Sequence, residues 1–192
     1  MKEFVKTITV TEEILLKQLE LSDVNEIFTT INRQRDYLGE WLPFIAFTNE
    51  KSDLEEYIRS VLAVPAKKGD FVFVIRYKDS FAGLIGFKDT DTLNRKTEIG
   101  YWLSEPYQKK GIITSSVKAL IHFAFEEMNL NRIQIKCAVG NFSSKKIPQR
   151  LGFRFEGIER DGELLTGNRF TDIEVYSLLK KEFSPQGNRS KK

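Results

Sequence analysis

The stretch Ile99–Ser116, IGYWLSEPYQKKGIITSS, decides the fold of this chain and its candidate site. Its first residues read as a strand that ends at Leu103, before Pro106. The turn Gln108–Gly111 then leads into a helix. Free N–H groups at such a helix start can hold a phosphate or pyrophosphate. The same residues also suit a plain strand-to-helix turn, in which Gly111 serves only the backbone geometry.

Apolar periodicity predicts alternating helices and strands on both sides of this stretch. A helix capped by Ser22 and a second helix with a Ser52–Glu55 capping box come first. The best-defined helix carries an apolar face over Val117–Met128, and a shorter helix covers Ser143–Arg150. Strands are predicted at Val5–Val10, Ile14–Leu19, Phe71–Tyr77, Phe81–Phe87, Thr97–Leu103, Arg132–Val139, Phe153–Arg160 and Thr171–Leu179.

This order of elements predicts an α+β fold with α/β layers. A mixed, mostly antiparallel central sheet is flanked by helices, with parallel pairing near the crossover helices. We expect one domain over residues 1–183 and a disordered, polar, basic tail over 184–192. The last hairpin turns either at Asp161-Gly162 or through Gly167-Asn168.

Composition excludes several classes of protein. The net charge of +3 is small and scattered, which argues against nucleic-acid binding. No run of about 18 apolar residues could span a membrane, and the first residues lack a secretory apolar core. Cys137 is the only cysteine, so a disulfide within the chain is excluded and a metal site is not expected. These features fit a cytoplasmic protein.

Two phosphate-binding motifs that the chain lacks reduce the set of ligands that the turn could hold. The chain has neither G-x-x-x-x-G-K-[ST] nor a G-x-G-x-x-G that follows a strand. What remains is Gln-x-x-Gly at the start of a helix. This pattern alone suits a nucleotide, a dinucleotide or coenzyme A.

Three segments resemble the GNAT acetyltransferases. Gln108–Thr114 resembles the family's acetyl-CoA signature, in which backbone amides receive the pyrophosphate. Asn141–Phe153 resembles a later element of the family, Asn-x-x-Ser ending in Leu-Gly-Phe. The aromatic segment that runs from Tyr37 to Pro43 is similar to a loop of the ribosomal-protein alanine/serine N-terminal acetyltransferase subgroup. One position departs from the pattern, because Ile113 stands where the family often has Gly or Ala.

The resemblance implies a GNAT-type fold and an acetyltransferase activity. Acetyl would pass from acetyl-CoA to a primary amine by direct attack in a ternary complex, without a metal. The implied acceptor is a protein N-terminal α-amine, as on a ribosomal protein, and the implied assembly is a homo-oligomer. Two alternatives stay open: a small amine such as a polyamine or drug, and a non-catalytic acyl-CoA-binding regulatory module.

The family pattern assigns the cofactor contacts residue by residue. Backbone amides near Trp102 and Leu103 would meet the pantetheine arm, or the strand merely pairs with its neighbour. Asn141 and Ser144 would bind the pantetheine end of the cofactor, or they cap a helix. The pyrophosphate would lie on the turn residues Gln108, Lys109, Lys110, Gly111, Ile112, Ile113 and Thr114.

The family pattern, together with the spacing along the last strand, suggests catalytic and acceptor-binding residues. Ser144 would donate to the leaving thiolate, and Glu163 would be the base, unless it is a solvated loop carboxylate. Asp172 and Tyr176 share one strand face, where Asp172 would orient the acceptor and Tyr176 would protonate the thiolate, unless it is simply packed. A weak base suffices, because an α-amine of pKa about 7.7–8.0 is roughly a tenth neutral at pH 7. The acceptor site would be walled by Tyr37, Trp41, Phe44 and Phe47, unless these rings are plain core between two helices.

Overall fold

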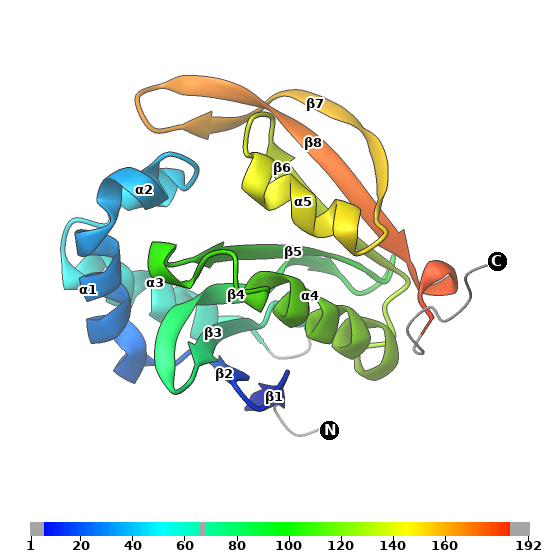
Figure 1. Ribbon diagram of the computed structural model, residues 1–192, viewed down its shortest axis with the longest axis horizontal. Helices are drawn as coiled ribbons and strands as arrows, with labels where there is room; N and C mark the ends of the chain where they lie inside the picture. The colour runs from blue at the N-terminus through cyan, green and yellow to red at the C-terminus, as the bar shows by residue number, and fades with distance from the viewer. Residues whose placement is uncertain (1–5, 66–67, 185–192) are drawn as a thin grey trace.

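The computed structural model describes residues 6–65 and 68–184, which form one mixed sheet with helices on both faces (Figure 1). The strand order is β1-β2-β3-β4-β5-β6-β8-β7, and every neighbouring pair is antiparallel except β5 and β6. From β1 to β8 the strands span Thr7–Thr9, Ile14–Gln18, Val72–Tyr77, Ser80–Asp91, Lys96–Leu103, Arg132–Ala138, Arg154–Leu165 and Arg169–Leu179. The predicted mixed, mostly antiparallel fold is confirmed.

The helices divide between the two faces of the sheet (Figure 1). Because successive strand residues point to opposite faces, β4 supplies Ile85 to one core and Leu84 to the other. The first core packs beneath α4 (Ile112–His122) and α5 (Phe142–Arg150). The second core packs beneath α1 (Val24–Arg33), α2 (Arg35–Gly39) and α3 (Lys51–Ala63). Among the described residues, no helix is long and apolar enough to cross a membrane.

β5 and β6 pair only at their beginnings and then diverge. The parallel register joins residues 96–98 of β5 to residues 132–134 of β6. Beyond Glu98, β5 continues to Leu103 and keeps its antiparallel partner β4. A gap therefore opens between the two central strands, with α5 on one side of it and the start of α4 at its wide end (Figure 1).

The predicted helix caps were wrong in detail. The second helix was expected to start with the capping box Ser52–Glu55, but α3 begins at Lys51. Asp53 Oδ2 accepts the N–H of Glu50 at 2.8 Å and closes the first turn. The predicted cap Ser22 likewise lies inside a 3-10 turn that precedes α1. In both places an aspartate, which can accept hydrogen bonds as a carboxylate, caps the turn instead of the serine.

Two further boundaries differ from the prediction. α4 begins at Ile112, earlier than the apolar face at Val117–Met128 suggested, and its end becomes π-helical over Phe123–Glu127. The last hairpin turns through Gly167-Asn168, the second of the two predicted positions, while Asp161-Gly162 lies inside β7. Residues 185–192 of the predicted tail, and the predicted strand residue Val5, lie outside the described residues.

Candidate active site

The turn before α4 leaves its N–H groups open. Lys109 and Gly111 both have left-handed backbone, with φ of 61° and 76°. The first main-chain hydrogen bond of the helix runs from Ser115 N–H to the Gly111 carbonyl at 3.0 Å. The N–H groups of residues 112–114 therefore have no acceptor within the helix, and they lie at its positive end. A Cβ on Gly111 would meet nothing within 4 Å, so glycine is required there for φ alone.

The side chains around this turn leave it accessible. Lys110 Nζ lies 5.5 Å from the ring centroid of Tyr77 and 5.3 Å from that of Tyr107, so its charge is held beside the turn. Arg150 of α5 donates to Thr114 Oγ1 at 3.3 Å and adds a second cation. The Ile113 side chain is buried in the core beneath α4. Its departure from the family pattern therefore does not narrow the turn.

At the end of β5, the backbone N–H and C=O groups of alternate residues face the gap. Ser104 N–H donates to the Ala82 carbonyl at 2.8 Å, which makes these two residues a hydrogen-bonded pair at the end of β4 and β5. Because backbone groups alternate between the two sides of a strand, Trp102 also faces β4, whereas Tyr101 and Leu103 face the gap. The predicted backbone contact to the pantetheine arm is thus available to Leu103 and Tyr101, but not to Trp102.

Tyr37 joins α2 to the turn before α4, and its predicted place in the wall of the acceptor site stays a prediction. Its hydroxyl donates to the Leu103 carbonyl at 3.2 Å and accepts from Gln108 Nε2. Burial raises the pKa of Tyr37, so the hydroxyl keeps the proton that it donates. Gln34 supports the same connection, because its Nε2 donates to Ser104 Oγ at 2.8 Å. α1, α2 and the turn before α4 are thereby held in one hydrogen-bonded network.

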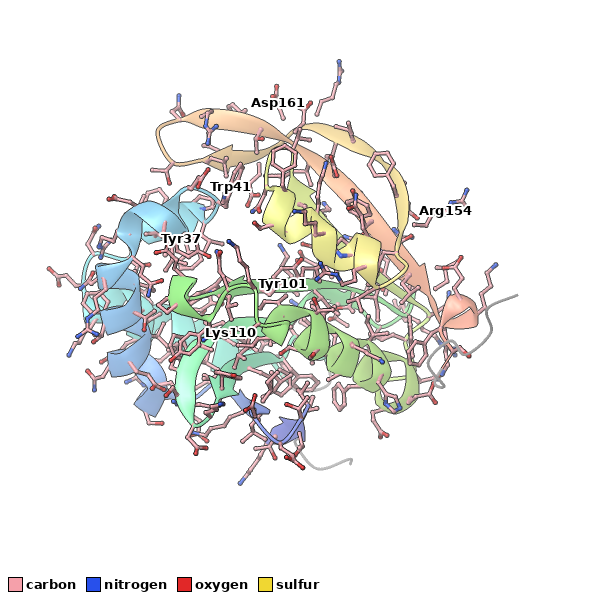
Figure 2. All side chains as sticks on the ribbon, viewed as in Figure 1. Tyr37, Trp41, Tyr101, Lys110, Arg154 and Asp161 are labelled. Carbon is pink, nitrogen blue, oxygen red and sulfur yellow. The ribbon has the colours of Figure 1, made fainter. Side chains whose placement is uncertain are left out.

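Ser144 connects the two sides of the gap. Its Oγ lies 3.2 Å from Tyr101 Oη on β5 and 3.3 Å from Cys137 Sγ on β6. Burial raises the pKa of Tyr101, and burial also raises the pKa of Cys137 to about 11. All three groups therefore carry their protons at neutral pH. Figure 2 shows Tyr101 between β5 and α5, where these donors meet.

Asn141 caps α5. Its Oδ1 accepts the N–H of Ser144 at 3.0 Å, which confirms the capping alternative for Asn141. The cap fixes Ser144 in the first turn of α5, and the hydroxyl then points toward Tyr101. A cap and a cofactor contact do not exclude each other, so the predicted pantetheine contact stays a prediction.

Tyr176 is packed, and its hydroxyl bonds to Glu174 and Gln149. The side chain is 4% exposed, and the hydroxyl donates to Glu174 Oε2 at 2.5 Å and accepts from Gln149 Nε2 at 3.3 Å. Burial, together with the Glu174 bond, raises the pKa of Tyr176 to about 12. The hydroxyl beside Ser144 belongs to Tyr101, so the role predicted for Tyr176 has a better candidate in Tyr101. The spacing of four along the last strand placed Tyr176 on a face but could not show its partners.

Glu98 lies at the vertex of the gap and was missed in the sequence. It is 4% exposed, and it accepts from Gln134 Nε2 at 3.0 Å and from Lys88 Nζ at 2.7 Å. Burial alone would lower the pKa of Lys88, but the carboxylate of Glu98 offsets this and the pKa is raised. The available signal was a charged residue within the otherwise apolar strand Thr97–Leu103.

A bulge in β7 presents Glu163. The pairing of β7 with β8 shifts register between Glu159 and Glu163, where Asp161 has φ of 49°. Asp172 Oδ1 accepts the Asp161 N–H at 2.9 Å. A Cβ on Gly162 would come within 2.9 Å of the neighbouring strand, so the bulge needs glycine there. Asp172, predicted to orient the acceptor, therefore holds the bulge that sets the position of Glu163.

The charges of Lys88 and Glu98, at the vertex of the gap, act on the pKa of Glu163. Its side chain reaches solvent, yet partial desolvation raises its pKa. Lys88 opposes that rise, Glu98 adds to it, and Lys136 opposes it. A carboxylate whose pKa is raised toward the working pH is better suited to accept a proton than an ordinary surface carboxylate.

The remaining predicted acceptor residues separate in the structure. Phe44 lines a cavity of about 370 Å³ between α1, α3 and the face of β4 and β5. Trp41 instead lies against Gly140, 3.4 Å from where a Cβ would be, and so touches the loop between β6 and α5. Thr166 at the tip of the β7–β8 hairpin donates to the Gly39 carbonyl at 3.2 Å. α2 therefore contacts both parts of the sheet across the gap (Figures 1 and 2).

Comparison with known proteins agrees with this geometry. Residues 13–154 match the acetyltransferase (GNAT) domain. The chain belongs to the GNAT acetyltransferase family. A putative ribosomal N-acetyltransferase of Bacillus subtilis, YdaF, is 36% identical over 92% of this GNAT chain and 97% of its own length. The ribosomal-protein-serine acetyltransferase of Escherichia coli is 30% identical over 91% of this chain and 97% of its own.

A solved structure of a further relative contains the cofactor. The microcin C7 self-immunity acetyltransferase MccE, in complex with acetyl-CoA and AMP, has a TM-score of 0.84 and 30% identity, covering 91% of this GNAT chain and 97% of its own. Within residues 6–65 and 68–184 of the present acetyltransferase, no group of three or more His, Cys, Asp or Glu side chains could hold a metal ion.

Proposed function

We propose that this protein transfers acetyl from acetyl-CoA to the α-amine of a protein N-terminus, of the ribosomal-protein type. The observation that carries the proposal is the gap between β5 and β6, which has the open turn of Gly111 at its wide end and Glu98 at its vertex. Both curated relatives named above have ribosomal acetyltransferase names, which supports the choice of acceptor.

The residues of the gap divide the binding of acetyl-CoA between them. The N–H groups of residues 110–114 would bind the pyrophosphate, with Lys109, Lys110 and Arg150 supplying positive charge. The backbone groups of Tyr101 and Leu103 would pair with the pantetheine arm, as a neighbouring strand would. The thioester would then lie beside Ser144, which connects the two strands.

The transfer itself needs positioning and two proton movements. The amine nitrogen attacks the thioester carbon, a C–N bond forms, and the C–S bond breaks. Glu163, whose pKa is influenced by the charges of Lys88 and Glu98, would accept the proton that the amine loses. Ser144, hydrogen-bonded to Tyr101, would supply a donor to the leaving thiolate. No acyl-enzyme is required.

The test is turnover with purified protein, measured as thiol release and as the mass of the product. Peptides that begin with serine or alanine should be acetylated on the α-amine, whereas the same peptides with a blocked α-amine and a free lysine should not. Ser144→Ala and Glu163→Gln should each lower kcat by 10-fold or more. Turnover on spermidine but on no peptide would overturn the proposal, and so would coenzyme A binding without turnover on any amine.

Comparison of the cell's protein N-termini with and without this protein would identify the acceptor. We expect a ribosomal protein to lose its N-terminal acetyl group when the protein is absent. The homo-oligomer implied by the resemblance also stays a proposal, which light scattering of the purified protein would test.

A further inference from the structure

Most of the residues that line the cavity beside the gap are apolar. It measures about 370 Å³, which is within the size range of small-ligand sites. Its floor is β4 and β5, including Leu84, Gly100 and Trp102, and its rim carries Phe44, Phe47 and Tyr57. Phe47 is 77% exposed, so the cavity opens to solvent on that side.

Three polar residues of the lining already have partners, and the lining also includes Tyr57 and Trp102, each with one polar group on a large ring. Thr48 Oγ1 donates to the Phe44 carbonyl at 3.0 Å. Asp53 Oδ2 accepts the N–H groups of Asn49 and Glu50, both at 2.8 Å. The third, Lys88, pairs with Glu98 as described above. An occupant of the cavity therefore meets mainly carbon.

The chemistry of the lining separates the classes of acceptor. A polyamine carries several positive charges and would need several carboxylates, but the lining has one, Asp53, and it also has the cation Lys88. A large apolar side chain would gain free energy from burial against these rings. Lys88 lines the cavity and pairs with Glu98, and its charge also acts on Glu163, the carboxylate that we propose for proton transfer. An acceptor whose amine is at that site therefore has its next residues at the cavity.

We propose that this cavity selects acceptors with a large apolar side chain at the second or third residue of the polypeptide N-terminus. The proposal rests on the proposed function, because it names a sequence preference within the class of N-terminal amines. The occupant is the acceptor side chain, and the exposed rim provides an entrance for a polypeptide.

The test uses the purified full-length protein, acetyl-CoA and two peptide series, Ser-X-Ala-Ala-Ala-Tyr and Ser-Ala-X-Ala-Ala-Tyr, with X as Ala, Leu, Phe, Asp or Lys. In at least one series, kcat/KM for Leu or Phe should exceed that for Asp and Lys by about 10-fold or more. This comparison needs no variant, so it remains decisive if a variant fails to fold.

Variants locate the preference. Phe47→Ala removes an exposed ring from the rim and should lower the Leu-to-Asp ratio at least threefold. Leu93→Ala is the matched control, because Leu93 is 94% exposed on the turn between β4 and β5, outside the cavity lining, and should leave the ratio unchanged. Gly100→Leu projects a side chain into the cavity from its floor, where a Cβ fits at 3.8 Å from Lys88, and should abolish the preference.

The outcomes distinguish the two proposals. Equal kcat/KM for all X in both series, or a preference for Asp or Lys, would overturn the apolar cavity site and leave the proposed function intact. If Phe47→Ala changed the preferred acyl length of the thioester but not the peptide preference, the occupant would be the acyl chain and the proposal would be wrong. Acetylation of spermidine alone would overturn both proposals.

Discussion

One added methyl group tests whether the turn before α4 binds the pyrophosphate through its backbone. Gly111→Ala places a Cβ where it meets nothing within 4 Å, so its effect is confined to the φ of 76°. The left-handed conformation costs a non-glycine residue roughly 1–2 kcal/mol. Without cofactor, the exposed turn of the variant should relax to avoid this cost. Cofactor binding must then restore the left-handed conformation of residue 111. Affinity for coenzyme A should therefore fall roughly 5- to 30-fold.

Gly152→Ala is the matched control. Gly152 has φ of 78°, and a Cβ there also meets nothing within 4 Å. Its turn cannot relax, because the next residue, Phe153, is buried and donates its N–H to the Pro148 carbonyl at 2.9 Å. The strain should therefore appear as a loss of roughly 1–2 kcal/mol in the free energy of unfolding, with unchanged affinity for coenzyme A.

Calorimetric titration with coenzyme A and urea unfolding separate the two effects. We expect Gly111→Ala to lose affinity with the smaller loss of stability, and Gly152→Ala to do the opposite. If Gly111→Ala bound coenzyme A as tightly as the wild type, the argument that the N–H groups of this turn hold the pyrophosphate would be refuted.

Three further predictions follow from the charges and contacts of the site. The pKa of Glu163 is raised above 4.5, so kcat/KM should begin to fall at a higher pH than it would with a solvated carboxylate as the base. Glu163→Gln should remove this acidic limb of the pH profile. An acidic limb that persists in the variant would exclude Glu163 as the base. Tyr37→Phe loses the bond to Gln108 and should raise the KM for acetyl-CoA about fivefold, with kcat within twofold, in steady-state kinetics; a change in kcat alone would count against the connection. Arg132 holds the pKa of Glu156 at about 2, below its ordinary 4.5, so this pair stabilises the fold fully above pH 4.5 and less as the pH falls toward 2. In urea unfolding Glu156→Gln should cost about 1 kcal/mol at pH 7, a figure reduced for solvent screening, and almost nothing near pH 2; an equal cost at both pH values would contradict the ion pair.

Local patterns predicted the elements well where one physical signal dominated. The strand ending at Leu103 and the turn of Gly111 follow from apolar runs, proline and glycine, and each depends on residues close in sequence. The caps were predicted less well, because Asp53 accepts the N–H of Glu50 at the helix start, whereas the prediction placed the cap at Ser52. Which of them wins depends on where the helix begins.

The contacts across the gap could not be predicted in this way. Ser144 meets Tyr101, 43 residues away in the chain, and Gln108 meets Tyr37, 71 residues away. Spacing along a strand assigned Tyr176 to a face, but its hydroxyl bonds to Glu174, a choice made by the packing around it.

The sequence by itself determined the family, the mixed sheet and the open turn, because these rest on motifs and on backbone preferences of neighbouring residues. Only the tertiary structure decided which side chains share the site. The divergence of β5 and β6 brings Glu98 to its vertex, and the bulge held by Asp172 sets Glu163. Both depend on pairing between strands far apart in the chain, which local preferences do not specify.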